Sequence, residues 1–236
     1  MAEVKTICNG ISHAICNICK NDCFFSLITE EESDILMDNI HLIKYRKGET
    51  IFKQKTYLTN ILFLQEGILK SYIEGTNGKN IILDINVPVD FVGLGDAFNK
   101  QVYAYSALAL TECKVLSIDH EVFKLIMSKN SKFSEVVFSW FTEHNNFLYR
   151  KISNLGTKQM HGRLADAILY LSQERFAKQN VFSYLSRSDI AEFTGMSKEN
   201  AIRLLTEFKN DGLVTVNARE IIINRLELLT KLQHIG

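Results

Sequence analysis

The chain has 236 residues, 46% of them hydrophobic and 23% charged, which suits one large domain or two small ones with a buried core. Its 27 Lys and Arg residues balance 27 Asp and Glu residues, which excludes a protein that holds nucleic acid by overall positive charge. The sequence has no apolar run of about 18 residues and no secretory signal in its first ten residues. We therefore expect a cytoplasmic protein without a membrane partner.

Four of the five cysteines fall in the first tenth of the chain, at Cys8, Cys16, Cys19 and Cys23, and the fifth is Cys113. An odd number of cysteines without a signal argues against a secreted disulfide scaffold. Thiolates spaced like Cys16, Cys19 and Cys23 can bind an iron–sulfur cluster or zinc, and Cys8 is a candidate fourth ligand. Three interpretations stay open: a redox-sensing iron–sulfur site, a zinc site or redox disulfide, and a purely structural segment.

The next part of the chain predicts a capped helix followed by many short strands. Thr29 precedes three glutamates, which predicts a helix that ends near Ile40. From Leu42 to Ile118, short apolar runs alternate with turn signals, and Asn77-Gly78 predicts a hairpin. This pattern predicts a jelly-roll, a cupin-like β-roll.

A long helix is predicted from about Ser131, because the apolar residues change to a helical period. Five of them recur at steps of 4, 3, 4 and 3, the spacing of a coiled-coil seam, namely Phe133, Val137, Trp140, His144 and Phe147. We assign this seam to a second copy of the chain, with His144 as a polar residue that sets the register. A second stripe, Val136, Phe141 and Leu148, is assigned to the β-roll. The alternative is one wide core-facing stripe in a monomer.

Gly156 and Thr157 predict the end of this helix, and another amphipathic helix is expected from Lys158 to Phe176. The predicted fold is α+β, with a β-roll sensor domain, a long dimerisation helix and a C-terminal winged helix-turn-helix. The expected boundaries are 1–24 for the cysteine-bearing segment, 25–128 for the β-roll, 129–156 for the dimerisation helix and 157–236 for the winged helix-turn-helix.

The segment Leu185–Leu205 carries the main functional prediction. Ser186 is expected to cap a first short helix, with Asp189 as its capping-box partner. Gly195 suits the sharp turn that follows, and Ser197 is expected to cap the second helix. Residues at helical spacing on this second helix form a buried stripe, which leaves three charged residues on its outer face: Lys198, Glu199 and Arg203.

The position of these charges directly after a capped turn is that of a recognition helix in the major groove. Arginine suits guanine O6 and N7, and glutamate can accept a hydrogen bond from cytosine N4. The alternative is a plain surface salt bridge between Glu199 and Arg203, which are four residues apart. The runs 212–216 and 219–223 then predict the two strands of a wing.

The order of β-roll, long helix and winged helix, together with Leu185–Leu205, resembles the Crp/Fnr family of transcription regulators. The resemblance implies a homodimer that reads palindromic double-stranded DNA with TGA-type half-sites, and RNA polymerase as a further partner if the protein is an activator. It implies that Glu199 and Arg203 read G·C pairs and that Lys198 tunes specificity. It also implies phosphate contacts from three further residues: Ser186, Arg187 and Arg219.

The β-roll departs from the family's cyclic-nucleotide pattern. The stretches that correspond to the family's Gly-Glu-Leu element and Arg-Ser pair are 91–98 and 103–107. The ribose-binding position is not acidic, and Tyr103 stands where the phosphate-binding arginine would be. Since a buried phosphate without its arginine would be an uncompensated charge, we predict that cyclic AMP does not bind and that the small effector is another one.

Cys16, Cys19 and Cys23 resemble the cluster ligands of the family's oxygen-sensing branch, although the fourth ligand position of that branch is Leu116 here. A redox or iron–sulfur protein is therefore the alternative function, and a ligand-binding module that acts on a protein partner is a third. The sequence has no Ser/His/Asp constellation, Gly-rich phosphate loop or HExxH motif, so we expect no enzymatic activity.

Overall fold

The computed structural model describes residues 24–98, 102–217 and 220–234. Its strands are β1 Ile40–Tyr45, β2 Thr50–Phe52, β3 Asn60–Glu66, β4 Leu69–Ile73, β5 Ile81–Asn86, β6 Phe91–Val92, β7 Ser106–Ala109, β8 Cys113–Asp119, β9 Val214–Asn217 and β10 Glu220–Ile223. Its helices are α3 Glu30–Asp38, α4 Leu94–Ala97, α5 His120–Lys129, α6 Ser131–Thr157, α7 Met160–Leu171, α8 Glu174–Ala177, α9 Arg187–Thr194, α10 Lys198–Asn210 and α11 Leu226–His234. Short 3-10 turns are η1 Phe24–Leu27, η2 Thr76–Gly78 and η3 Val181–Tyr184.

Two antiparallel sheets form the β-roll, with strand orders β1-β8-β3-β6 and β2-β7-β4-β5. Strands β3 and β8 are buried along almost their whole length, because both faces of their sheet are covered. The predicted hairpin is confirmed: β4 and β5 pair antiparallel from Leu69↔Asn86 to Ile73↔Ile81. The predicted capping of α3 is also confirmed, since Thr29 and Glu32 form a capping box.

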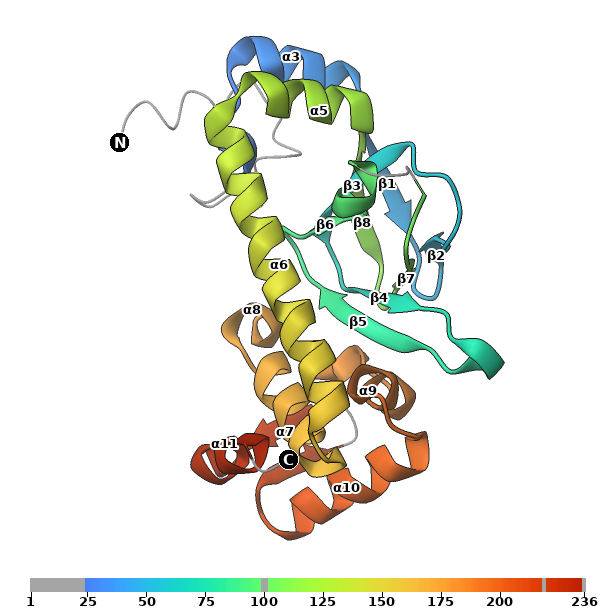
Figure 1. The fold of residues 1–236 in the computed structure, drawn as a ribbon, viewed down its shortest axis with the longest axis vertical. Helices are drawn as coiled ribbons and strands as arrows, with labels where there is room; N and C mark the ends of the chain where they lie inside the picture. Colours follow the sequence, from blue (N-terminus) through green and yellow to red (C-terminus); the bar gives the residue numbers. More distant parts are fainter. Residues whose placement is uncertain (1–23, 99–101, 218–219, 235–236) are drawn as a thin grey trace.

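Helix α6 runs from the β-roll to the C-terminal helices and is the longest element in Figure 1. Its first half packs on a cluster of aromatic rings in the core of the roll. Phe25, Phe63, Phe91 and Phe123 are each at most 2% exposed, and they meet mostly edge to face. Phe133 of α6 completes this cluster, 5.5 Å from Phe123 between ring centroids.

This packing corrects the predicted dimer seam: Phe133, Val137, Trp140, His144 and Phe147 face their own chain. Phe133 and Val137 are each 1% exposed within one copy. The ring of Trp140 meets Phe91 at 5.4 Å, and the ring of Phe147 stacks on Tyr170 at 4.1 Å. His144 lies 3.5 Å from a carboxylate oxygen of Asp84 rather than in a seam between copies. The heptad spacing of these five residues therefore reflects the packing of α6 on its own chain, not on a second copy.

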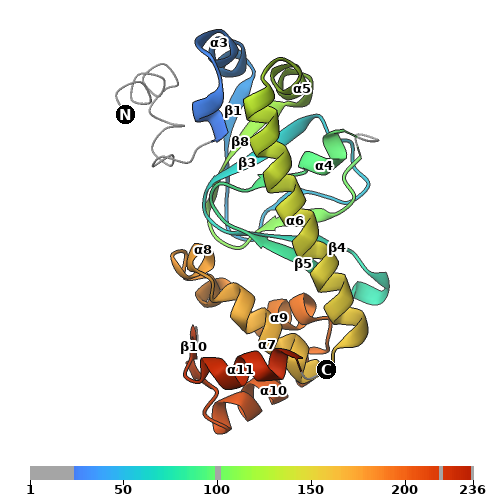
Figure 2. The same cartoon turned by 60° about the vertical axis from the view of Figure 1, so that its left-hand side comes forward.

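The C-terminal part is a winged helix-turn-helix below the roll, as Figure 2 shows from another side. The α+β class and the order of β-roll, long helix and winged helix are confirmed. Two helix boundaries differ from the prediction. Helix α6 continues through Gly156 to Thr157, and the expected helix from Lys158 to Phe176 is divided into α7 and α8 near Gln173.

A second apolar core joins the two halves of the molecule. The outer face of the β4–β5 sheet contributes Tyr72, Ile82 and Ile85, and this layer is continuous with the buried faces of α7, α9 and α10. Because these residues are at most 8% exposed, the winged helix is packed against its own β-roll rather than tethered beside it.

Candidate DNA-binding surface

The helix-turn-helix has the local structure that the sequence predicts. Ser186 caps α9 and forms a capping box with Asp189, and the Ser197 side chain accepts a hydrogen bond from the backbone of Asn200 at the start of α10. Gly195 connects the two helices with a φ of 63°, in the left-handed region that favours glycine. Each of these three local expectations is confirmed.

Helix α10 separates cleanly into a buried and an exposed face. The buried side chains are at most 2% exposed and are Ala201, Leu204, Leu205 and Phe208. Lys198, Glu199 and Arg203 lie on the exposed face, in the first two turns of the helix. The stripe at helical spacing therefore fixes the rotation of α10 so that all three charges point to solvent.

The predicted alternative, an ion pair between Glu199 and Arg203, is not the pairing that the structure has. Arg203 Nη1 lies 3.4 Å from Glu207 Oε2, one turn further along α10, and both side chains are exposed. An exposed pair of this kind contributes little stability, so the guanidinium is available to another acceptor at small cost.

The other predicted contacts lie around this helix. Ser186 is exposed and Arg187 is half-buried, both at the start of α9. Arg219 lies outside the described residues, between the paired strands β9 and β10 of the wing. The prediction missed Ile202, which is 43% exposed on the same side of α10 as Lys198. Its spacing of four residues from Lys198 is the signal that could have identified it.

Two neighbours hold the turn between α9 and α10 in place. A Cβ added at Gly195 would lie 2.6 Å from Cδ2 of Leu155, at the end of α6. From α7, Arg163 Nη1 donates a hydrogen bond of 3.2 Å to the Gly195 carbonyl oxygen. The turn therefore rests directly on the long helix.

An ion-pair triad joins α9 to the β-roll. Lys70 of β4 lies 2.6 Å from an oxygen of Asp189 and 3.2 Å from an oxygen of Glu192. Burial opposes ionisation of Asp189, but hydrogen bonds from Lys70 and Ser186 outweigh this effect and lower the pKa of Asp189. The capping residue of the helix-turn-helix is thus also a contact between domains.

We expect Lys70→Met to lower the free energy of unfolding at pH 7 by about 1–3 kcal/mol, because it removes charge-assisted hydrogen bonds from two carboxylates. Asp189 has a lowered pKa, so its share of this stability is present at neutral pH and is lost as the pH falls through that pKa. Urea unfolding should show the wild type and variant converging in acid. The control is Lys114→Met, whose partner Glu66 is exposed, and its cost should stay below about 0.5 kcal/mol. Equal losses in the two variants would contradict the role of Lys70.

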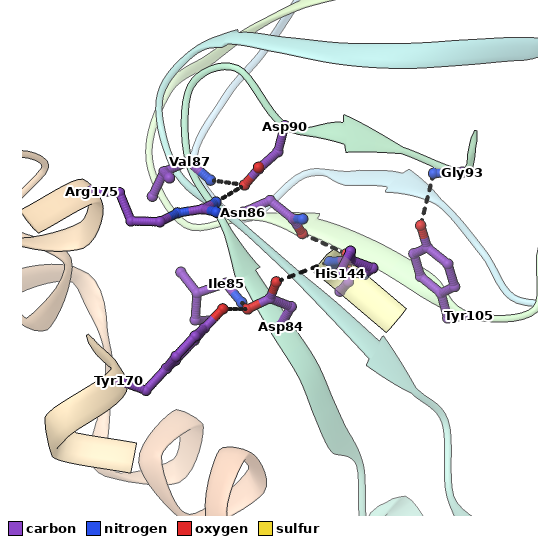
Figure 3. A network of polar contacts seen from close by, with 11 residues as sticks. Asp84, Ile85, Asn86, Val87, Asp90, Gly93, Tyr105, His144, Tyr170 and Arg175 are labelled. Atoms are coloured by element: carbon purple, nitrogen blue, oxygen red, sulfur yellow. Dashed lines mark hydrogen bonds and ion pairs between the residues drawn. The ribbon is translucent and has the colours of Figure 1, made fainter. Parts of the chain in front are cut away.

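A network of polar groups around two buried carboxylates, Asp84 and Asp90, lies at the same junction (Figure 3). Asp84 accepts a hydrogen bond of 3.0 Å from the Tyr170 hydroxyl of α7, and Arg175 of α8 forms an ion pair with Asp90. Burial raises the pKa of both carboxyls, and it lowers the pKa of His144. Three helices therefore contact the short segment from Asp84 to Asp90, which fixes the winged helix relative to the roll.

A second heptad stripe of α6 is exposed in part: Phe138 and Ile152 face solvent, whereas Phe141, Leu148 and Leu155 are half-buried. Its members recur at steps of 3, 4, 3, 4 and 3, and we call them the outer stripe: Phe138, Phe141, Asn145, Leu148, Ile152 and Leu155. Phe138 is 66% exposed and Ile152 is 68% exposed. A heptad stripe with one central asparagine is the pattern of a two-helix coiled coil.

Aromatic side chains fill the part of the roll where the sequence departs from nucleotide binders. Tyr103 is 6% exposed and stacks on Phe52 with ring centroids 3.7 Å apart. The Tyr105 hydroxyl accepts a hydrogen bond from the backbone N–H of Gly93, 2.7 Å away. A Cβ at Gly93 would lie 2.8 Å from the Tyr103 ring, so these residues are closely packed.

Cys113 is a core residue. It is 2% exposed, its thiol donates to the carbonyl oxygen of Ile68, and burial raises its pKa. The residues that the structure describes contain no group of three His, Cys, Asp or Glu side chains suited to a metal ion. They therefore offer no ligand set for a cluster, and Cys8, Cys16, Cys19 and Cys23 lie outside them.

Two domain families match this chain. Residues 42–130 match the model of a cyclic nucleotide-binding domain, and residues 162–232 match that of a Crp-like helix-turn-helix domain. Within the described part of the chain, no helix is both long enough and apolar enough to span a membrane.

Similar proteins match over most of the chain. An anaerobic regulatory protein of Haemophilus influenzae is 27% identical over 228 residues, covering 92% of this chain and 88% of its own length. A fumarate and nitrate reduction regulatory protein of Escherichia coli is also 27% identical, covering 98% of this chain and 97% of its own length. The structure of FixK2 from Bradyrhizobium japonicum shares the fold, with a TM-score of 0.74 at 18% identity over 84% of this chain and 98% of that one.

Proposed function

Because the chain belongs to the Crp/Fnr family of DNA-binding transcription regulators, which are not enzymes, we propose that it reads palindromic DNA with TGA-type half-sites as a homodimer. The observation that carries this proposal is the exposed face of α10. Lys198, Glu199 and Arg203 stand together in its first two turns, directly after the capped turn. In this position they can contact base edges in the major groove.

Each residue has a proposed role. Arg203 would donate two hydrogen bonds to a guanine, Glu199 would accept one from a cytosine, and Lys198 would tune the preference for neighbouring bases. Ser186, Arg187 and Arg219 would contact phosphates and fix the orientation of the helix without reading sequence. The net charge of zero agrees with these separate roles for base-reading and phosphate-contacting residues, because specificity would then depend on a few base contacts rather than on overall charge.

The homodimer is proposed to form through the outer stripe of α6, in place of the seam that sequence reasoning assigned. The outer stripe has the narrow heptad spacing of a coiled coil, and two of its apolar side chains, Phe138 and Ile152, are exposed in one copy. Two copies related by a two-fold axis would then present two α10 helices to successive major grooves.

Selection of bound fragments from random DNA tests this proposal as a whole. The full chain should enrich inverted repeats whose half-sites contain TGA, with centres about 10 base pairs apart. Enrichment of direct repeats or of single sites would refute the homodimer. Failure to enrich any sequence would refute specific reading by α10. The same chain would contact RNA polymerase if it activates transcription.

The effector is proposed to be something other than cyclic AMP. Tyr103 stands where the family's phosphate-binding arginine would be, and it stacks on Phe52 and packs against Gly93. A cyclic phosphate would therefore lack the positive charge of that arginine. Calorimetry with millimolar cyclic AMP should therefore show no saturable binding. Saturable binding in the micromolar range would contradict this prediction.

An oxygen or redox stimulus is the second proposal, favoured by the names of the relatives, which include an anaerobic regulatory protein. Cys16, Cys19 and Cys23, with Cys8 as fourth ligand, would hold an iron–sulfur cluster. Protein purified without oxygen should then contain iron and absorb visible light, and Cys19→Ala should lose both signals, whereas Cys113→Ala should keep them. A colourless, iron-free protein that still binds its operator would end this proposal and leave the DNA-reading role intact.

A further inference from the structure

A pocket of about 600 Å³ lies where α6, α7 and α11 meet the helix-turn-helix. Its volume falls within the range of roughly 300–1,000 Å³ that is usual for small-molecule sites. Apolar rings line part of it, from Phe147, Tyr170 and Phe193. The pocket is separate from the interior of the β-roll, where the family's nucleotide pattern lies.

The charge of the lining is strongly unbalanced. Arg150, Lys151, Lys158 and Arg163 all line the pocket, and Asp166 is the one acidic residue among the lining residues that the structure describes. Asp166 is already engaged, because Lys158 lies 2.6 Å from one of its oxygens. Three basic side chains, Arg150, Lys151 and Arg163, therefore line the pocket without an acidic partner in its wall, and burial lowers the pKa of Lys151 to about 7.

Two buried donors in this lining lack hydrogen-bond partners within the described chain. Lys151 is 8% exposed, and its Nζ has no hydrogen-bond acceptor, although it lies 3.2 Å from the centroid of the Phe193 ring. The Nε of Arg163 is also buried without an acceptor. Buried donors that stay unsatisfied are costly, so a ligand that supplied an acceptor would gain their hydrogen bonds.

We propose that this pocket binds a small organic phosphate whose anionic group is held by Arg150, Lys151 and Arg163. Two guanidinium groups match phosphate oxygens in both charge and donor geometry, and the Lys151 amine adds a further hydrogen-bond donor. The adjacent rings provide an apolar wall for the organic part of the ligand.

The position of the pocket connects it to DNA reading, and this part of the inference rests on the proposed function. Phe193 and Thr194 at the end of α9 line the pocket, and Arg163 donates to Gly195 in the turn. A ligand that recruits the Arg163 guanidinium would therefore act directly on the turn that positions α10. Occupancy should change operator affinity.

The experiment is calorimetry on the full chain without DNA, with inorganic pyrophosphate as the probe of the anionic group and ATP as an organic phosphate. Both probes should bind saturably, at one site per subunit. Lys151→Met and Arg150→Gln should each weaken binding about tenfold or more, which is the loss expected for one charge-assisted hydrogen bond. Arg150 is exposed, so its variant keeps the test valid even if Lys151→Met disturbs folding.

Lys231→Met is the matched control, because Lys231 is an exposed lysine of α11 that does not line the pocket. Its affinity for both probes should equal that of the wild type. The proposal is overturned if neither probe saturates, if Arg150→Gln binds as tightly as the wild type, or if Lys231→Met weakens binding equally.

Operator binding, measured by fluorescence anisotropy with and without pyrophosphate, separates this inference from the proposed function. If the chain binds the probes but no operator, the pocket proposal stands and the proposed DNA-reading role is refuted. If the chain binds its operator but neither probe, the DNA-reading role stands and the pocket proposal is refuted.

Discussion

Arg203→Ala should weaken binding of the homodimer to a TGA-containing palindrome by about 2–6 kcal/mol, that is, by about 30-fold to more than 10⁴-fold. The loss is about 1–3 kcal/mol in each half-site, because each subunit gives up one bidentate contact to guanine. The helix itself should be unaffected, since Arg203 is exposed and its partner in the free protein is a weak surface pair with Glu207.

Fluorescence anisotropy with the palindrome and with a scrambled duplex measures this effect. Specific binding should fall steeply, whereas binding to the scrambled duplex should change little, because non-specific binding depends on phosphate contacts. Glu207→Gln is the matched control: it removes the same ion pair but keeps the reading residue, so specific affinity should be retained. Undiminished specific binding by Arg203→Ala would show that α10 does not read DNA in this way.

Ile152→Glu should convert the homodimer into a monomer. Ile152 is 68% exposed in one copy and lies in the outer stripe, so in a two-fold coiled coil the new carboxylate would be buried near its own copy. Burying an unpaired charge there costs more than an apolar contact supplies. Operator affinity should fall by about 10²–10⁴-fold, because one subunit would engage only one half-site.

Light scattering after gel filtration gives the mass of each variant directly. Ser139→Glu is the control, since Ser139 is exposed on α6 but lies outside the outer stripe. It should stay dimeric and bind its operator normally. A dimeric Ile152→Glu variant would place the interface elsewhere on the chain.

The helix-turn-helix could be predicted from sequence because its signals are local. Ser186, Gly195 and Ser197 each act within three residues of their own position, through capping bonds or backbone conformation. The stripe on α10 then determines which charges face outward. These features follow from short-range chemistry, so they need no knowledge of the rest of the chain.

The partners of α6 could not be predicted in the same way. Two heptad stripes wind along this helix, and periodicity alone does not say which one meets the same chain. Trp140 and His144 are turned inward because Phe91 and Asp84 lie there, more than forty residues earlier in the sequence. The pairing of Lys70 with Asp189 spans 119 residues and left no local signal.

The contact between Leu155 and Gly195 has a consequence for the distance between the two halves of an operator. Leu155 belongs to the outer stripe and also supports the turn before α10. The geometry of the coiled coil would therefore determine the distance between the two α10 helices of the homodimer. A rotation of α6 by a fraction of a turn would change this spacing and mismatch it with one helical repeat of DNA, about 34 Å. A signal in the roll that rotated α6 would therefore abolish DNA binding without changing any base-reading residue.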